Sequence, residues 1–183
     1  LGAFDRLVRA GKVRAIGASN FTAAQVREAL DVAAAQGLPR YAVLQPEYNL
    51  FDRAGFDGPL RDLALAEGLA VICYYSLASG FLTGKYRSAA DLAQSPRGAG
   101  IGQKYLTPRG LRILAALDAV AARHAAQPGE VALAWLMARP GVTAPIASAS
   151  NVAQVEGLVR ATQLQLSADD VEALDAASAP EAA

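Results

Sequence analysis

At residues 13–45 the chain reads VRAIGASNFTAAQVREALDVAAAQGLPRYAVLQ, which is a strand-like run, a helical run and a second strand-like run. We predict strands at Val13–Ala18 and Tyr41–Gln45, because both are short and largely apolar. A helix is predicted from about Thr22 to Gln36, where apolar residues recur at helical spacing, and Gly37 ends it. Strand, helix and strand in this order indicate parallel strands joined by a right-handed crossover.

The same alternation continues along the rest of the chain. A helix is predicted at Leu60–Glu67, and Leu69–Tyr75 is a near-continuous apolar run, typical of a strand buried on both faces. The segment from Leu77 to about Leu106 contains five glycines and Pro96, so we predict a long loop that is functional or mobile. The remaining predicted elements are helices at about Pro108–Ala126, Gly129–Ala138 and Val152–Arg160, a fourth strand at Val142–Ala147, and a last helix that opens at Ser167.

Four strands leave two architectures open. A doubly wound sheet could close with four strands, whereas a complete (β/α)8 barrel needs eight strands and about 250 residues. The outer strands of a four-stranded barrel fragment would have unpaired backbone at Val13–Ala18 and Val142–Ala147. We therefore expect the isolated chain to dimerise or aggregate.

Composition excludes several classes of function. The 183 residues include 17 basic and 17 acidic side chains, so the net charge of 0 argues against a general nucleic-acid or membrane-surface binder. One cysteine and one histidine exclude a disulfide framework and a histidine-rich or multi-cysteine metal centre. No apolar run approaches the roughly 20 residues that cross a bilayer. With no signal peptide evident, we expect a cytoplasmic protein, and its arginine-rich, alanine-rich composition hints at a bacterial gene.

The chain begins at Leu1, and its one methionine is Met137. We expect it to be either a piece of a longer protein or a processed product.

Neutral polar side chains follow each predicted strand. They occur at Ser19 and Asn20, in residues 45–49, in residues 74–76, and in residues 148–151. Parallel α/β folds build their sites at these carboxyl ends. Asn and Gln side chains match both atoms of a carboxamide, and a Tyr face can stack on a planar ring. The alternative, that Ser19 and Asn20 only cap the following helix, stays open at this point.

Four blocks of sequence resemble the aldo-keto reductases. They are GKVRAIGASNF at 11–21, QPEYNL at 45–50, YSLASGFLTGKY at 75–86, and PIASAS at 145–150 followed by a helix. The resemblance covers nearly the whole chain in the order of that family. It implies that residues 1–183 form a partial domain, the C-terminal half of a (β/α)8 TIM barrel with four parallel strands and surrounding helices. It also implies a nicotinamide dinucleotide bound across the carboxyl-end face.

The resemblance implies a set of cofactor-binding residues. The partners of the nicotinamide carboxamide are matched by Ser19, Asn20 and Gln45, and the aromatic residue that stacks on the nicotinamide ring is matched by Tyr75. The segment along the pyrophosphate is matched by Ser76, Leu77, Ser79 and Leu82. The segment that receives the adenosine phosphate is matched by Ser148, Ser150, Asn151 and Gln154. Members that prefer the phosphorylated cofactor usually have a basic residue in place of Gln154 and Asn in place of Leu158. NADPH remains the expected cofactor, and NADH is possible.

The resemblance assigns no catalytic residue to this chain. The family's Asp, Tyr, Lys and His lie upstream of the first block, in the half of the barrel that is absent. The implied activity of the complete protein is reduction of small aldehydes or ketones, and this chain alone is expected to be inactive. Its expected partner is the missing N-terminal half or another copy of the chain. The alternative is a non-catalytic cofactor-sensing or interaction protein resembling channel β subunits.

Other motifs have simpler interpretations. We expect Cys73 to be inert core, His124 to be a solvated helix residue, Tyr48 to pack near the rim and Glu47 to brace a neighbour. The run Gly98–Gly102 only weakly resembles a phosphate-binding loop, because it does not follow a strand.

Overall fold

Four parallel strands form the centre of the structure, a computed structural model that describes residues 1–180. The strands pair in the order β1-β2-β3-β4, and they are β1 (Ile16–Ser19), β2 (Tyr41–Gln45), β3 (Ala70–Cys73) and β4 (Ala144–Pro145). Ser19 is in register with Gln45, and Cys73 with Pro145, so the carboxyl ends of all four strands meet at one edge. The predicted half-barrel arrangement of four parallel strands with surrounding helices is confirmed.

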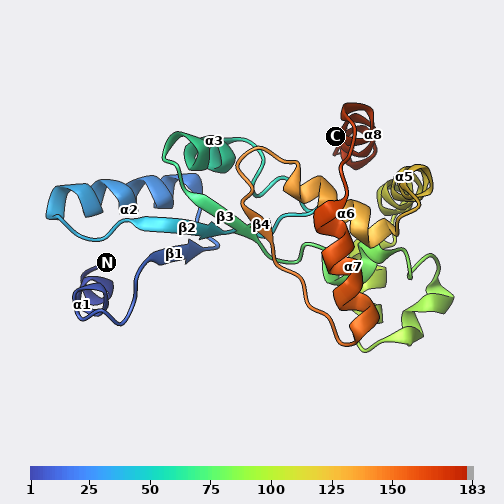
Figure 1. The fold of residues 1–183 in the computed structure, drawn as a ribbon, viewed down its shortest axis with the longest axis horizontal. Coiled ribbons are helices and arrows are strands. Elements are labelled where there is room, and N and C mark those ends of the chain that lie inside the picture. The colour runs from blue at the N-terminus through green and yellow to red at the C-terminus, as the bar shows by residue number, and fades with distance from the viewer. Residues whose placement is uncertain (181–183) are drawn as a thin grey trace.

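Helices join and surround the strands (Figure 1). They are α1 (Gly2–Arg9), α2 (Ala23–Gln36), α3 (Pro59–Ala66), α4 (Gly98–Tyr105), α5 (Pro108–His124), α6 (Pro128–Met137), α7 (Val152–Gln163) and α8 (Ala168–Ser178), with 3-10 helices η1 (Ala78–Thr83) and η2 (Ala89–Gln94). In Figure 1 the last four helices gather at the far end of the long axis from the N-terminus. There α6 packs against α5 and α7, and α5 packs against α8.

The ends of α2 follow from local chemistry. The Thr22 hydroxyl accepts a hydrogen bond from the Gln25 backbone N–H, and the Gln25 side chain accepts one from the Thr22 N–H, which forms a capping box. Gly37 ends the helix with a φ of +62°, a conformation that costs glycine little. The predicted helix is confirmed, with Thr22 as its cap rather than its first turn.

Three strands are shorter than predicted. The segment 13–15 lies outside β1, and β3 ends at Cys73, two residues before the backbone turns into the left-handed region at Tyr75. β4 has only two residues, and Pro145 has no N–H to give to the sheet. The pairing with β3 is completed on either side by Thr143 and Ile146, whose N–H groups donate to Val71 and Cys73.

The prediction of one long loop at 77–106 is wrong. This segment contains η1, η2 and α4, and α4 packs on η2. A side chain at Gly98 would overlap the carbonyl oxygen of Leu92, so this glycine permits the close approach of the two elements. Gly98 and Gly102, where a side chain would meet Leu92, therefore reflect helix packing rather than a phosphate-binding loop.

One face of the sheet is buried by helices and the other is open. Along β1, Ile16 and Ala18 are buried, whereas Gly17 and Ser19 are exposed. The core also encloses Tyr48 completely, which confirms its predicted packing role. A second open surface lies on α7, where three valines at helical spacing, Val152, Val155 and Val159, are 73%, 51% and 53% exposed.

A charged cluster joins α5 to α8. The buried carboxylate of Asp170 accepts hydrogen bonds from Arg123 and from the Ser167 hydroxyl, and its Oδ2 lies 2.7 Å from His124 Nε2. The expectation that His124 is solvated is wrong, because its side chain is only 25% exposed and is held by Asp170. The hydrogen bonds from His124 and Arg123 hold the pKa of Asp170 well below its usual range.

Residues 1–183 produced alone are expected to self-associate at micromolar concentration. The outer edges of β1 and β4 and the exposed valines of α7 present unpaired backbone and apolar surface. Replacing the valines by Val152→Glu and Val159→Lys should shift the sedimentation profile towards the monomer. The control Leu111→Lys removes an equally apolar exposed side chain from α5 and should not. A wild-type monomer with a cooperative melting transition would contradict the prediction.

Asp170→Asn is expected to lower the free energy of unfolding by about 2 kcal/mol at pH 7, because it weakens charge-assisted hydrogen bonds to a buried group. Since the pKa of Asp170 is lowered on folding, its contribution is present above the pKa of the unfolded carboxyl, about 4, and is lost as the pH falls. Denaturant unfolding should thus show wild type and variant converging at acidic pH. The exposed neighbour variant Asp169→Asn serves as the control, and an equal loss for both variants would contradict the account.

Candidate functional site at the carboxyl ends of the strands

Backbone strain is concentrated where the strands end. Of the five described non-glycine residues with positive φ, four follow β1 or β3: Asn20 at 60°, Tyr75 at 52°, Ala78 at 48° and Ser79 at 58°. The fifth, Ala125, ends α5. Left-handed backbone at non-glycine residues carries an energetic cost and is common at functional sites. This edge of the sheet is therefore the first candidate for a site.

The ends of β1 and β2 are joined through Ser19. Its hydroxyl donates to the backbone carbonyl oxygen of Gln45 at 2.9 Å, and the two residues are paired in register at the ends of their strands. Thr22, and neither Ser19 nor Asn20, caps the following helix. The capping alternative is thereby excluded, and both side chains remain exposed at the edge of the sheet.

Asn20 is fixed by a residue from a distant part of the chain. The hydroxyl of Tyr74 donates to Asn20 Oδ1 at 2.7 Å. The Tyr74 phenol is protonated at neutral pH, as tyrosine ordinarily is, and burial together with the neighbouring Glu47 carboxylate raises its pKa further. This bond engages Oδ1, and the Nδ2 group of Asn20 makes no hydrogen bond to the other described residues, so it is available to a ligand.

Tyr75 presents its ring at the same edge. The side chain is 55% exposed, and its ring lies edge-on to that of Tyr74 with 5.3 Å between the centroids. Its carbonyl oxygen accepts a hydrogen bond from Asn49 Nδ2 at 3.1 Å. Asn49 itself is fully buried, and its Oδ1 accepts from the N–H groups of Phe51 and Asp52. Asn49 therefore supports the Tyr75 backbone and offers nothing to a ligand.

An ion-pair cluster from α4 borders the site. Lys104 Nζ lies 3.1 Å from Glu47 Oε1 and 3.0 Å from Asp52 Oδ1, and the Tyr105 hydroxyl donates to Asp52 Oδ2. The prediction that Glu47 braces a neighbour is confirmed. Sequence reasoning missed Lys104 because α4 falls inside the segment predicted to be a loop, and it missed Asp52, between β2 and α3, because nothing in the sequence pairs it with Lys104.

The residues expected along a pyrophosphate differ in exposure. Ser76 is buried and its hydroxyl donates to the Cys73 carbonyl oxygen, and Leu82 is also buried. Their side chains are therefore turned away from the edge. Leu77 and Ser79 are half-buried in the same turn. A ligand passing here would meet mainly backbone.

The residues expected around an adenosine phosphate form a separate cluster at the start of α7. Asn151 caps the helix by accepting from the Gln154 N–H, and Gln154 Oε1 accepts from the N–H and the hydroxyl of Ser150. Ser148 is exposed just before them. The cluster is neutral, as the sequence predicted, and several of its donors already have partners.

Other candidate chemistries are absent from the described part of the chain. Burial raises the pKa of Cys73 to about 12, which confirms the thiol as inert core. Within residues 1–180 there is no group of His, Cys, Asp and Glu side chains able to hold a metal ion. No helix over the same residues has the length and apolar character to span a bilayer.

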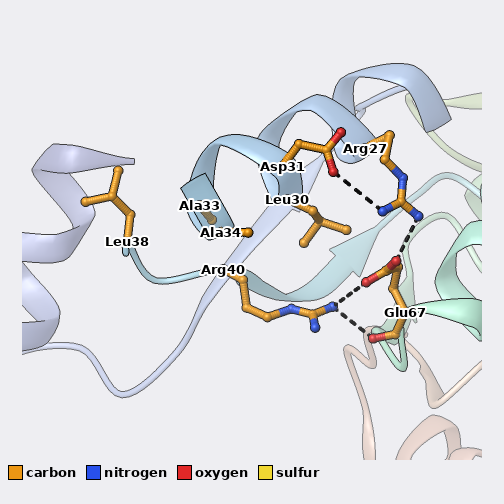
Figure 2. Close-up of a pocket in the computed structure, with 8 residues that line it drawn as sticks. All are labelled: Arg27, Leu30, Asp31, Ala33, Ala34, Leu38, Arg40 and Glu67. Carbon is orange, nitrogen blue, oxygen red and sulfur yellow. Dashed lines mark hydrogen bonds and ion pairs between the residues drawn. The ribbon is translucent and has the colours of Figure 1, made fainter. Parts of the chain in front are cut away.

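A pocket of about 270 Å³ lies at the opposite end of the sheet, beside α2 (Figure 2). Arg40, directly before β2, and Arg27 both bind the carboxylate of Glu67, at 3.2 and 2.8 Å. The two guanidinium groups thus already have an anion between them. This pocket is remote from the carboxyl ends of the strands, and its charges join α2 to α3.

Comparisons with known proteins agree on one family. The sequence model of the aldo/keto reductase family matches residues 1–179. The chain is 32% identical over 181 residues to "Protein tas" of Escherichia coli K12, covering 96% of this chain and 51% of the relative. It is 31% identical over 172 residues to "Aldo-keto reductase yakc [NADP(+)]" of Schizosaccharomyces pombe, covering 91% of this chain and 48% of the relative.

A solved structure has the same fold. A thermostable aldo-keto reductase, Tm1743, crystallised with the inhibitor epalrestat, superposes with a TM-score of 0.71 at 25% identity, over 97% of this chain and 53% of that one. The chain spans about half the length of the curated relatives it matches.

Proposed function

This chain belongs to the aldo/keto reductase family, and from that premise we propose that its complete protein reduces aldehydes or ketones with a nicotinamide dinucleotide. When bound, the dinucleotide would supply a hydride to the carbonyl carbon of the substrate, and Ser19, Asn20, Gln45 and Tyr75 would bind and orient the nicotinamide. The observation that carries the proposal is the convergence of Ser19, Asn20, Gln45 and Tyr75 at one strained edge of the sheet.

The atoms at this edge fit a nicotinamide carboxamide. Because the Ser19 hydroxyl donates to Gln45, its oxygen is left to accept from the amide NH2 of a ligand. Asn20 Nδ2 is placed to donate to the amide oxygen, since its Oδ1 is bound by Tyr74. The exposed ring of Tyr75 offers a flat face to the nicotinamide.

We propose NADPH as the preferred form, with NADH as the second possibility. The name of the fission-yeast relative specifies NADP(+). In this chain Ser148, Ser150, Asn151 and Gln154 offer hydroxyl and amide groups but no cation to a phosphate. The preference for a phosphorylated cofactor should therefore be modest, because charge-assisted hydrogen bonds are about twice as strong as neutral ones.

The resemblance to this family implies that the proton for the new hydroxyl group comes from a residue outside this chain. Tyr48 and Cys73 are buried, and the Tyr74 hydroxyl is bound to Asn20. We place the proton donor in the other half of the barrel, supplied by the same polypeptide or by a second one.

The test is binding and turnover by the complete protein as it is expressed from its gene. NADPH should bind, as followed by quenching of tryptophan fluorescence, and should be oxidised in the presence of 4-nitrobenzaldehyde. Asn20→Ala should weaken NADPH binding about tenfold, the effect of losing a hydrogen bond worth about 1.4 kcal/mol. The control Gln36→Ala removes an exposed amide at the far end of α2 and should leave binding unchanged.

Absence of binding by both NADPH and NADH would contradict the proposal. Binding without oxidation by any of a panel of aldehydes and ketones would instead support the non-catalytic, cofactor-sensing alternative.

A further inference from the structure

We propose that Tyr74 is a positioning residue that sets which end of the Asn20 amide faces the cofactor, and so makes this position recognise a carbonyl oxygen. The inference rests on the proposed function. It adds a residue that the resemblance to known reductases does not assign, and it follows from one contact, the 2.7 Å hydrogen bond from the Tyr74 hydroxyl to Asn20 Oδ1.

An asparagine amide can turn either its oxygen or its NH2 group towards a ligand. The two orientations have similar shape, so a neighbour must distinguish them. The Tyr74 phenol is protonated at neutral pH, because the ordinary pKa of tyrosine is about 10, and it donates that proton to Oδ1 at 2.7 Å. The Glu47 carboxylate does not compete with Asn20 Oδ1 for the hydrogen bond from the Tyr74 hydroxyl, because Glu47 is paired with Lys104.

Tyr74 is itself held at several points. Its backbone N–H donates to the Pro46 carbonyl oxygen at 3.0 Å, and its carbonyl oxygen accepts from the Tyr48 N–H at 3.4 Å. Its ring contacts the ring of Tyr75 edge-on. One residue at the end of β3 thus connects the two proposed contacts of the nicotinamide, the amide of Asn20 and the ring of Tyr75.

The consequence is a chemical selectivity that can be measured. Because Tyr74 donates to Oδ1, the Asn20 amide is held with its Nδ2 group free of protein partners among the described residues, so this position favours a ligand with a carbonyl oxygen. Without the phenol hydroxyl, the amide can turn over and its preference is lost. The effect should therefore depend on the nicotinamide substituent and should not extend to the adenosine half of the cofactor.

The experiment measures dissociation constants with the complete protein for three probes. NADP+ carries the carboxamide, its 3-acetylpyridine analogue keeps the carbonyl oxygen but lacks the NH2 group, and 2′-phospho-ADP-ribose lacks the ring altogether. Tyr74→Phe should weaken binding of the first two by five- to tenfold and change binding of the third by less than twofold. The control Tyr86→Phe removes a hydroxyl bound to Ser95 and should leave all three unchanged.

A double-mutant cycle separates positioning from general structural damage. If Tyr74 acts through Asn20, the double variant Tyr74→Phe with Asn20→Ala should bind NADP+ no more weakly than Asn20→Ala alone. The inference is overturned if the losses of NADP+ affinity in the two single variants multiply in the double variant. It is also overturned if Tyr74→Phe weakens binding of 2′-phospho-ADP-ribose as much as binding of NADP+. Failure of all three probes to bind the wild-type protein would instead overturn the proposed function.

Discussion

Parallel pairing of β1, β2 and β3 is the constraint on which the candidate site depends. The pairing sets Ser19 beside Gln45 and, through a further bridge beyond the strands, Glu47 beside Tyr74. Residues 26 and 54 positions apart in the chain therefore come within hydrogen-bond distance, as Ser19–Gln45 and Asn20–Tyr74 show. A shift of one residue in this register would turn Ser19 to the helix-covered face and remove its contact.

The same pairing leaves the molecule unclosed. The sheet ends at β1 on one side and at β4 on the other, and its inward face and the valines of α7 stay open. In a complete barrel the first strand pairs with the last, so the sheet has no unpaired edge. The chain matches about half of each relative, and the open surfaces of the structure are those that the rest of a barrel would cover.

Sequence reasoning located the strands and pointed to the edge of the candidate site, because polar residues follow apolar runs at each strand end. It failed where tertiary packing decides the outcome. The five glycines and Pro96 of residues 77–106 predicted a loop, yet Gly98 lies in α4, where its missing side chain allows the close approach of Leu92. His124 looked solvated because its partner, Asp170, lies 46 residues away. Ser76 and Leu82 matched a binding segment, but the turn after β3 buries their side chains, which no periodicity reveals.

The most direct test of the account is a crystal structure of the complete protein with NADP+ bound. The account predicts the carboxamide oxygen at about 3 Å from Asn20 Nδ2, with the nicotinamide ring against Tyr75 at the carboxyl ends of the strands. A dinucleotide bound elsewhere, for example in the pocket formed by Arg27 and Arg40 at the opposite end, would contradict it.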